Sequence, residues 1–172
     1  MSVKIKLEGV IVPVITPVLD NEDVDEEGFR RLLDHCIEKG LHGVFVAGSN
    51  GETMALTQAQ RDKAIRIAID EVRGRIPVLC GIMDASTRRV IENVKRVEDS
   101  GGEYVVATPV FYARHSCGRE HIRHFEALAK STPLKILVYN IPQFTVVNLP
   151  PDIVFELSKI DNIIGIKESS GN

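Results

Sequence analysis

Short runs of β-branched and other apolar residues alternate with longer amphipathic stretches along the chain, at a spacing of roughly 30 residues. This alternation is typical of a parallel sheet in which each strand is followed by a helix. The predicted strands are Gly9–Thr16, His42–Ala47, Ile76–Ile82, Tyr104–Thr108, Leu134–Tyr139 and Ile163–Lys167.

Five helices are predicted between these strands from start and stop signals in the sequence. The expected boundaries are Asp25 and Gly40 for the first helix, the capping box Thr57–Gln60 for the second, Asp84 or Ser86 and then Gly101 for the third, the loop Pro109–Arg119 before the fourth, and Pro150–Asp152 for the fifth.

Such a sheet can close in two ways, as an open doubly wound sheet or as part of an eightfold β/α barrel. The first strand is not followed by a Gly-x-Gly-x-x-Gly turn, so the commonest signature of the doubly wound sheet is missing. A barrel takes about 250 residues, and this chain has 172. We therefore predict a TIM (β/α)8 barrel of the α/β class, in which residues 1–172 form a single partial domain: the first five βα units plus strand six of a longer barrel.

Composition and charge exclude several classes of protein. Apolar residues make up 44% of the chain and charged residues 26%, the balance of a folded globular protein. The net charge of −3 offers no basic field for nucleic acid or an anionic membrane, and no apolar run reaches the ~18 residues of a membrane span. The three cysteines form no CxxC pair, which argues against a disulfide framework or a zinc ribbon. A reducing cytoplasm is the predicted location.

Reactive side chains follow the predicted strands at their carboxyl ends, where barrel enzymes build their active sites. They are Thr16, Ser49, Phe111, Tyr112, Tyr139 and Lys167. Side chains alternate between the two faces of a strand, so Lys167 shares a face with Gly165 and Ile163 and is expected to point into the barrel mouth. Ile164 and Ile166 are expected to point the other way, toward helices.

A lysine in such a mouth can serve as a nucleophile. Partial burial lowers the pKa of an amine because it disfavours the charged form, and the neutral amine can attack a ketone to form a Schiff base. A nearby phenol and hydroxyl can shuttle protons. The alternative is a solvated lysine that follows a strand, since most lysines are exposed.

No metal site is predicted. His115 with Cys117, and His121 with His124, have spacings compatible with metal ligands, but neither pair has carboxylate support. We expect these residues on a solvated surface. The acidic run Asp20–Glu27 lacks the central glycine of a calcium loop and is expected to serve a helix N-terminus.

Three motifs, in this order and spacing, carry a family resemblance. They are the glycine turn Gly48–Glu52 (GSNGE), the tyrosine motif Tyr139–Pro142 (YNIP) and the lysine motif Gly165–Asn172 (GIKESSGN). Together they resemble the dihydrodipicolinate synthase/N-acetylneuraminate lyase family of class I aldolases. The resemblance extends from the segment Gly9–Pro17 to the end of the chain.

The resemblance implies a barrel enzyme in which Lys167 forms an imine with pyruvate or another 2-oxo acid and an aldehyde is the second partner. Tyr139 would transfer protons, and Ser49 would link it to a tyrosine from a neighbouring subunit. Backbone amides around Ser49 and Asn50 would hold the substrate carboxylate, with Thr16 beside them. No metal or organic cofactor is implied, and the full-length protein would be a homotetramer built from tight dimers.

Three departures from the family pattern bear on the substrate. True dihydrodipicolinate synthases carry an arginine at the position of Phe144, where it grips the carboxylate of the second substrate. They also carry two threonines where this chain has Ser49 and Asn50, which is closer to 2-keto-3-deoxy sugar-acid and 4-hydroxy-2-oxoglutarate aldolases. Phe111 stands at the position of the neighbour-supplied tyrosine and Tyr112 follows it, so which ring enters the proton relay is open.

The predicted function is therefore a Schiff-base lyase or aldolase, more like those aldolases than a true synthase. Three alternatives remain open at this point. One is 4-hydroxy-tetrahydrodipicolinate synthase of lysine biosynthesis, another is a non-catalytic relative that binds 2-oxo acids, and the third is an unrelated α/β ligand-binding domain.

Overall fold

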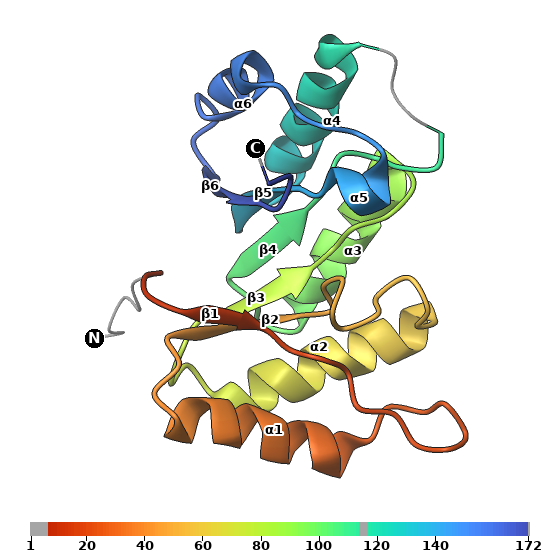
Figure 1. Ribbon diagram of the computed structural model, residues 1–172, viewed down its shortest axis with the longest axis vertical. Coiled ribbons are helices and arrows are strands. Elements are labelled where there is room, and N and C mark those ends of the chain that lie inside the picture. Colours follow the sequence, from red (N-terminus) through yellow and green to blue (C-terminus); the bar gives the residue numbers. More distant parts are fainter. Residues whose placement is uncertain (1–6, 114–116, 172) are drawn as a thin grey trace. The chain divides into compact units, whose positions relative to one another are not determined.

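The computed structural model describes residues 7–113 and 117–171 of the chain (Figure 1). The chain divides into two compact units, each with its own parallel strands and helices. The first unit is Met1–Gly81 with Asp99–Glu103, and the second is Ile82–Glu98 with Tyr104–Asn172.

The first unit is built from β1 (Ile11–Pro13), α1 (Glu26–Glu38), β2 (Gly43–Val46), α2 (Gln58–Val72) and β3 (Val78–Gly81). Its strands are parallel and follow one another in sequence order, with Val44 of β2 paired to Val12 of β1 and to Val78 of β3. Helices α1 and α2 lie side by side along these strands (Figure 1). Fully buried Phe29 and Leu33 place the apolar stripe of α1 in the core.

Both helices of the first unit begin where the sequence predicts. Asp25 caps α1 by accepting the backbone N–H of Gly28 at 2.9 Å. At α2, the N–H of Thr57 donates to Gln60 Oε1 at 2.8 Å and the N–H of Gln60 donates to Thr57 Oγ1 at 3.3 Å. This is the predicted capping box, which satisfies two backbone donors that the helix leaves free.

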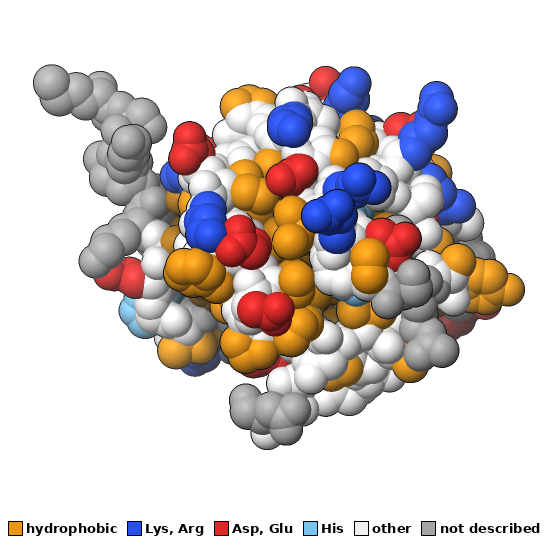
Figure 2. Space-filling model, turned by 90° about the horizontal axis from the view of Figure 1, so that it is seen from above, with side chains coloured by type: hydrophobic (Ala, Val, Ile, Leu, Met, Phe, Trp, Pro, Cys, Tyr) orange, Lys and Arg blue, Asp and Glu red, His pale blue; other side chains and the backbone are white. Residues whose placement is uncertain are grey.

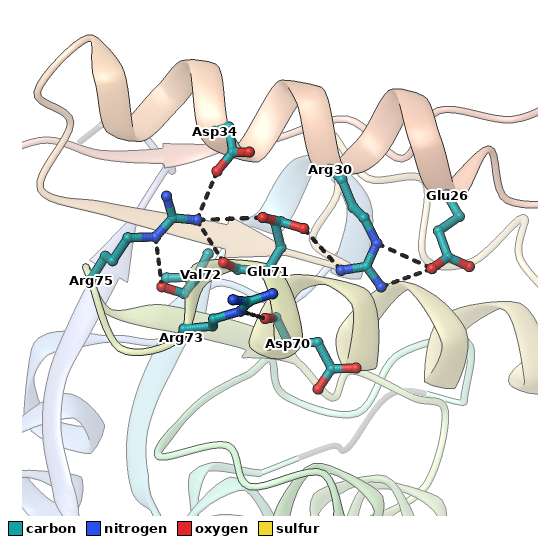
Figure 3. A network of polar contacts seen from close by, with 8 residues as sticks. All are labelled: Glu26, Arg30, Asp34, Asp70, Glu71, Val72, Arg73 and Arg75. Carbon is teal, nitrogen blue, oxygen red and sulfur yellow. Dashed lines mark hydrogen bonds and ion pairs between the residues drawn. The ribbon is translucent and has the colours of Figure 1, made fainter.

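Polar contacts connect α1 to α2 along their exposed edge (Figure 3). Arg30 of α1 donates to Glu71 of α2 at 2.9 Å and also pairs with Glu26 at 2.7 Å. Arg75, just beyond α2, pairs with Asp34 of α1 at 2.7 Å and lies 3.5 Å from Glu71. Glu71 is the shared acceptor, and only 15% of its side chain is exposed. The two helices are therefore joined by charge as well as by their apolar faces.

The second unit contains the remaining elements, and its strands are again parallel and in sequence order. Its helix α5, only four residues long, is absent from the sequence prediction. The elements are α3 (Thr87–Asp99), β4 (Tyr104–Ala107), α4 (Gly118–Ser131), β5 (Lys135–Asn140), α5 (Pro142–Thr145), α6 (Pro151–Leu157) and β6 (Ile163–Glu168).

Of the two candidate caps of α3, the structure selects Ser86. Its Oγ accepts the N–H of Arg89 at 3.4 Å, the third residue of the helix. Asp84 instead accepts the N–H of Ala85 at 2.7 Å and pairs with the Arg89 side chain at 2.8 Å.

Two histidines of α4 correct the sequence analysis. His121 and His124 are buried, with exposed fractions of 7% and 2%, so the predicted solvated surface is wrong for both. His124 Nδ1 lies 2.9 Å from Thr87 Oγ1, and its Nε2 lies 3.2 Å from the carbonyl oxygen of Thr108. Because both ring nitrogens have polar neighbours, His124 can be buried between α3 and the end of β4. His115 lies outside the described residues.

The predicted strands are all present, and most are shorter than predicted. The largest difference is β1, which covers Ile11–Pro13 rather than Gly9–Thr16. One further bond, from the N–H of Val14 to the carbonyl of Phe45 at 3.0 Å, ends its pairing with β2. On β6, Ile164 and Ile166 are 44% and 38% exposed, and they line a groove with Val154 of α6 to which Ile163 and Gly165 also contribute, so their assignment to the helix side of the strand stays a prediction.

Basic and acidic side chains are interspersed with apolar ones on the face drawn in Figure 2. That face carries no extended field of one sign. Within residues 7–113 and 117–171, no helix is long and apolar enough to cross a membrane.

Candidate active site

Lys167 and Tyr139 occupy paired positions on the neighbouring strands β6 and β5, at their carboxyl ends. Paired residues on adjacent parallel strands project to the same face of the sheet. Lys167 Nζ lies 3.9 Å from the centre of the Tyr139 ring, within the range of a cation–π contact. Tyr139 is buried, with 3% of its surface exposed, and Lys167 is half-buried. The structure thus brings together the predicted amine and the predicted phenol.

A short segment after β6 fixes the end of the lysine side chain. Lys167 Nζ donates to Ser169 Oγ at 3.1 Å. Ser169 is itself held twice by its backbone, because its N–H donates to the carbonyl of Asn140 at 2.9 Å and its carbonyl accepts from Gln143 Nε2 at 2.8 Å. The amine therefore sits between an aromatic face and an anchored hydroxyl.

Glu168, next to the lysine, accepts hydrogen bonds on both carboxylate oxygens. Asn140 Nδ2 donates to Oε2 at 2.9 Å, and the N–H of Ser170 donates to Oε1 at 2.6 Å. The hydrogen bond from Asn140, aided by those from Ser170, lowers the pKa of the Glu168 carboxyl below its ordinary value, against a weaker opposing effect of burial. Glu168 therefore stays ionised beside the lysine at neutral pH.

The predicted carboxylate-binding turn belongs to the first unit. Its flanks Ala47 and Glu52 adopt left-handed φ values of 51° and 53°, which are rare for residues other than glycine. At Gly51 an added Cβ would lie 3.1 Å from Thr16 Oγ1 and 3.2 Å from the backbone nitrogen of Ala47, so a larger residue would crowd the turn. Such backbone strain is typical of functional turns.

Thr16 and Asn50 both help to hold this turn. Thr16 Oγ1 donates to the carbonyl of Gly51 at 2.9 Å, and Asn50 Nδ2 donates to the carbonyl of Pro13 at 3.3 Å. Ser49 is half-buried and Asn50 is exposed. The union of Ser49, Asn50 and Thr16 with Lys167 in one site stays a prediction.

The aromatic residues named from the sequence all lie in the second unit and differ in exposure. Tyr112 is 96% exposed and has a left-handed φ of 71°, whereas Phe111 is half-buried. Phe144, on α5 after the tyrosine motif, is 70% exposed. Of the adjacent pair, only Tyr112 carries a hydroxyl, and its ring projects into solvent.

Metal-binding groups do not gather in the part of the chain that the structure describes. Within residues 7–113 and 117–171, no three His, Cys, Asp or Glu side chains are placed to hold a metal ion.

The model of the dihydrodipicolinate synthetase family matches residues 6–172. The chain belongs to this family. Its curated relatives include the 4-hydroxy-tetrahydrodipicolinate synthases of Syntrophus aciditrophicus (strain SB), 39% identical over 96% of this chain and 56% of the relative, and of Methanothermobacter thermautotrophicus, 36% identical over 96% and 58%.

Solved structures of the family superpose closely on this chain. The 4-hydroxy-tetrahydrodipicolinate synthase of Methylacidiphilum fumariolicum SolV gives a TM-score of 0.92 at 34% identity, over 97% of this chain and 55% of that one. YagE, a prophage protein of the same family from E. coli K12 in complex with pyruvate, gives 0.89 at 35% identity, over 93% and 54%. These matches confirm the predicted fold class. The chain spans a little more than half the length of the relatives it matches.

Three residues of the site were not predicted to have a role: Asn140, Gln143 and Ser169. Asn140 and Ser169 lie inside the tyrosine and lysine motifs, and Gln143 directly follows the tyrosine motif. The available signal was a polar residue directly after a strand that carries a candidate catalytic group. Their partners lie up to 29 residues away in the sequence, as from Asn140 to Ser169, and local sequence patterns do not reveal such distant contacts.

Proposed function

We propose that the protein is a Schiff-base lyase or aldolase that acts on pyruvate or a related 2-oxo acid. The observation that carries this proposal is the Lys167 amine, held 3.9 Å from the centre of the Tyr139 ring at the carboxyl ends of paired strands. Family membership and the pyruvate complex of YagE support the choice of substrate.

The proposed reaction begins when the neutral amine of Lys167 attacks the ketone carbon of the 2-oxo acid. A carbon–nitrogen bond forms and water leaves. In cleavage, the protonated imine accepts the electron pair of the carbon–carbon bond that breaks; in condensation, the imine loses a proton from the neighbouring carbon, and the resulting enamine donates its electron pair to the aldehyde carbon. Tyr139 is the proposed acid and base for these proton transfers. Ser49 is the proposed relay, and the backbone around Ser49 and Asn50, braced by Thr16, is the proposed carboxylate site.

The proposed enzyme is a homo-oligomer, a tetramer built as a dimer of dimers. In this assembly, a neighbouring copy of the chain supplies the third hydroxyl of the proposed proton relay. Tyr112 is the proposed donor of that hydroxyl. Its exposure of 96% is consistent with a ring that inserts into another subunit, and Phe111 has no hydroxyl to offer.

Two candidates remain for the aldehyde partner. Phe144 offers no cation at the position where a true synthase grips a second carboxylate, which favours cleavage of a hydroxylated 2-oxo acid such as a sugar acid. The names of the curated relatives favour condensation with an aspartate-derived aldehyde instead. An assay of both reactions decides between them: cleavage of a hydroxylated 2-oxo acid without condensation supports the first candidate, and condensation of pyruvate with the aspartate-derived aldehyde without that cleavage supports the second.

Borohydride reduction in the presence of pyruvate tests the proposal. We expect a stable adduct on the peptide that contains Lys167, detected by mass spectrometry, and no adduct in a Lys167→Ala variant. Lys135 is the matched control, because its Nζ lies 4.8 Å from the centre of another ring, Tyr104, at the opposite end of β5. Lys135→Ala should leave the adduct intact.

An intact, folded protein that shows no adduct on Lys167 would contradict the proposal. Pyruvate binding by calorimetry, without turnover of any 2-oxo acid tested, would instead favour a non-catalytic binding protein.

A further inference from the structure

Asn140 and Glu168, which directly follow Tyr139 and Lys167 in the sequence, form a second residue pair across β5 and β6. Successive side chains of a strand point to opposite faces, so Asn140 and Glu168 project away from the reactive amine. Their side chains meet there, at 2.9 Å between Asn140 Nδ2 and Glu168 Oε2.

Asn140 is fixed by every polar atom of its side chain. Only 1% of its surface is exposed. Its Nδ2 also donates to Asn148 Oδ1 at 2.8 Å, and its Oδ1 accepts the N–H of Leu149 at 3.1 Å. A buried amide with both donors and its acceptor in use has one low-energy orientation, because any rotation leaves a buried polar atom without a partner.

The backbone of Asn140 also binds the segment that follows Lys167. Its carbonyl accepts the N–H of Ser169 at 2.9 Å. The two residues that follow Lys167 are thus both attached to the residue that follows Tyr139. The Ser170 N–H completes the arrangement by donating to Glu168 Oε1 at 2.6 Å.

We infer that Asn140 and Glu168 are positioning residues that hold the Lys167 amine at its distance from Tyr139. This inference rests on the proposed function, since it concerns the same lysine. Neither side chain touches the substrate in this scheme. Their hydrogen bond, the Asn140–Glu168 clamp, acts on the strand end that carries the amine.

The clamp is tested by the rate at which the imine forms between Lys167 and pyruvate in the complete protein, quenched with borohydride at increasing times. Glu168 is exposed, so Glu168→Ala removes the clamp without opening a cavity in the core. Displacements near 1 Å cost up to about a hundredfold in rate, but the backbone hydrogen bond from the Ser169 N–H to the Asn140 carbonyl remains in this variant, so we expect the maximal rate to fall roughly tenfold. The pyruvate concentration at half-maximal rate should change less than about twofold, since the clamp does not bind pyruvate.

Glu168→Gln supplies the conservative rescue. Its amide oxygen can still accept from Asn140 Nδ2, so the maximal rate should stay within about threefold of the unmodified protein. Asn162→Ala is the matched control, because Asn162 directly precedes the first residue of the same strand. Asn162 Nδ2 donates to the carbonyls of Thr132 at 3.0 Å and Ala129 at 3.1 Å, far along β6 from the lysine, so its loss should lower the melting temperature and leave the rate unchanged.

The outcomes separate the two proposals. If the unmodified protein forms no imine at Lys167, the proposed function is wrong and the inference falls with it. If the unmodified protein forms the imine and folded Glu168→Ala forms it equally fast, the clamp has no positioning role while the proposed function stands. An equal slowing by Asn162→Ala would also overturn the inference, because the loss would then reflect general destabilisation.

Discussion

Glu71→Gln tests the charged junction between α1 and α2 (Figure 3). Glu71 is 85% shielded, since its side chain is 15% exposed, and it accepts from Arg30 at 2.9 Å and lies 3.5 Å from Arg75. A shielded hydrogen bond between charged groups contributes about 1.5–3 kcal/mol. Both arginines keep a second carboxylate, Glu26 or Asp34, and are partly exposed, which reduces the loss. We expect the free energy of unfolding to fall by about 1–2 kcal/mol.

Urea unfolding measures this loss. With a slope of about 2 kcal/mol per molar urea, the midpoint should shift down by roughly 0.5–1 M. Glu27→Gln is the matched control, because Glu27 pairs with Arg31 four residues along the same helix and the two side chains are 86% and 65% exposed. That pair should contribute less than about 0.5 kcal/mol. Equal midpoint shifts for the two variants would refute the argument that shielding gives the Glu71 contacts their strength.

Burial raises the pKa of the Cys80 thiol to about 12. A thiol reagent at about pH 8 should therefore leave Cys80 unmodified in the folded protein while it labels Cys117, which is exposed. Labelling of Cys80 at the same rate as Cys117 would contradict the burial of Cys80. The folded-state pKa of Glu168 lies below its unfolded value, so its contribution to stability is complete above the unfolded pKa of about 4.3 and is lost as the pH falls through the folded value. The melting temperature of Glu168→Gln should therefore decline less steeply with acid in that range than that of the unmodified protein, and parallel curves would contradict the shift.

The elements that could be predicted from the sequence are those whose signals are local. The cap at Asp25 and the capping box at Thr57 involve residues three positions apart, so their geometry follows from the helix itself. Likewise, Tyr139 and Lys167 could be placed at strand ends because each directly follows an apolar run. Their meeting requires only that two consecutive strands be parallel neighbours.

The parts that could not be predicted depend on partners far apart in the chain. His124 is buried because Thr87, 37 residues away, and Thr108, 16 residues away, meet its two ring nitrogens. The residues within one helical turn of His124 do not predict those partners. Helix α5 was missed for another reason, since four residues are too few to show a helical period.

A comparison of Lys135 with Lys167, each of which lies over a tyrosine ring in the described part of the second unit, shows why position along a strand carries more functional information than the contact itself. Lys135 also lies over a tyrosine ring, and its Nζ donates to that ring's hydroxyl, Tyr104 Oη, at 3.3 Å. By contact chemistry alone the two amines are alike. Lys135, however, begins β5, whereas Lys167 lies near the carboxyl end of β6, where barrel enzymes collect their reactive groups. Only Lys167 is followed by residues that are anchored to the neighbouring strand through Asn140. The arrangement around the amine, rather than the aromatic ring beneath it, therefore distinguishes the proposed nucleophile from a lysine with a structural role.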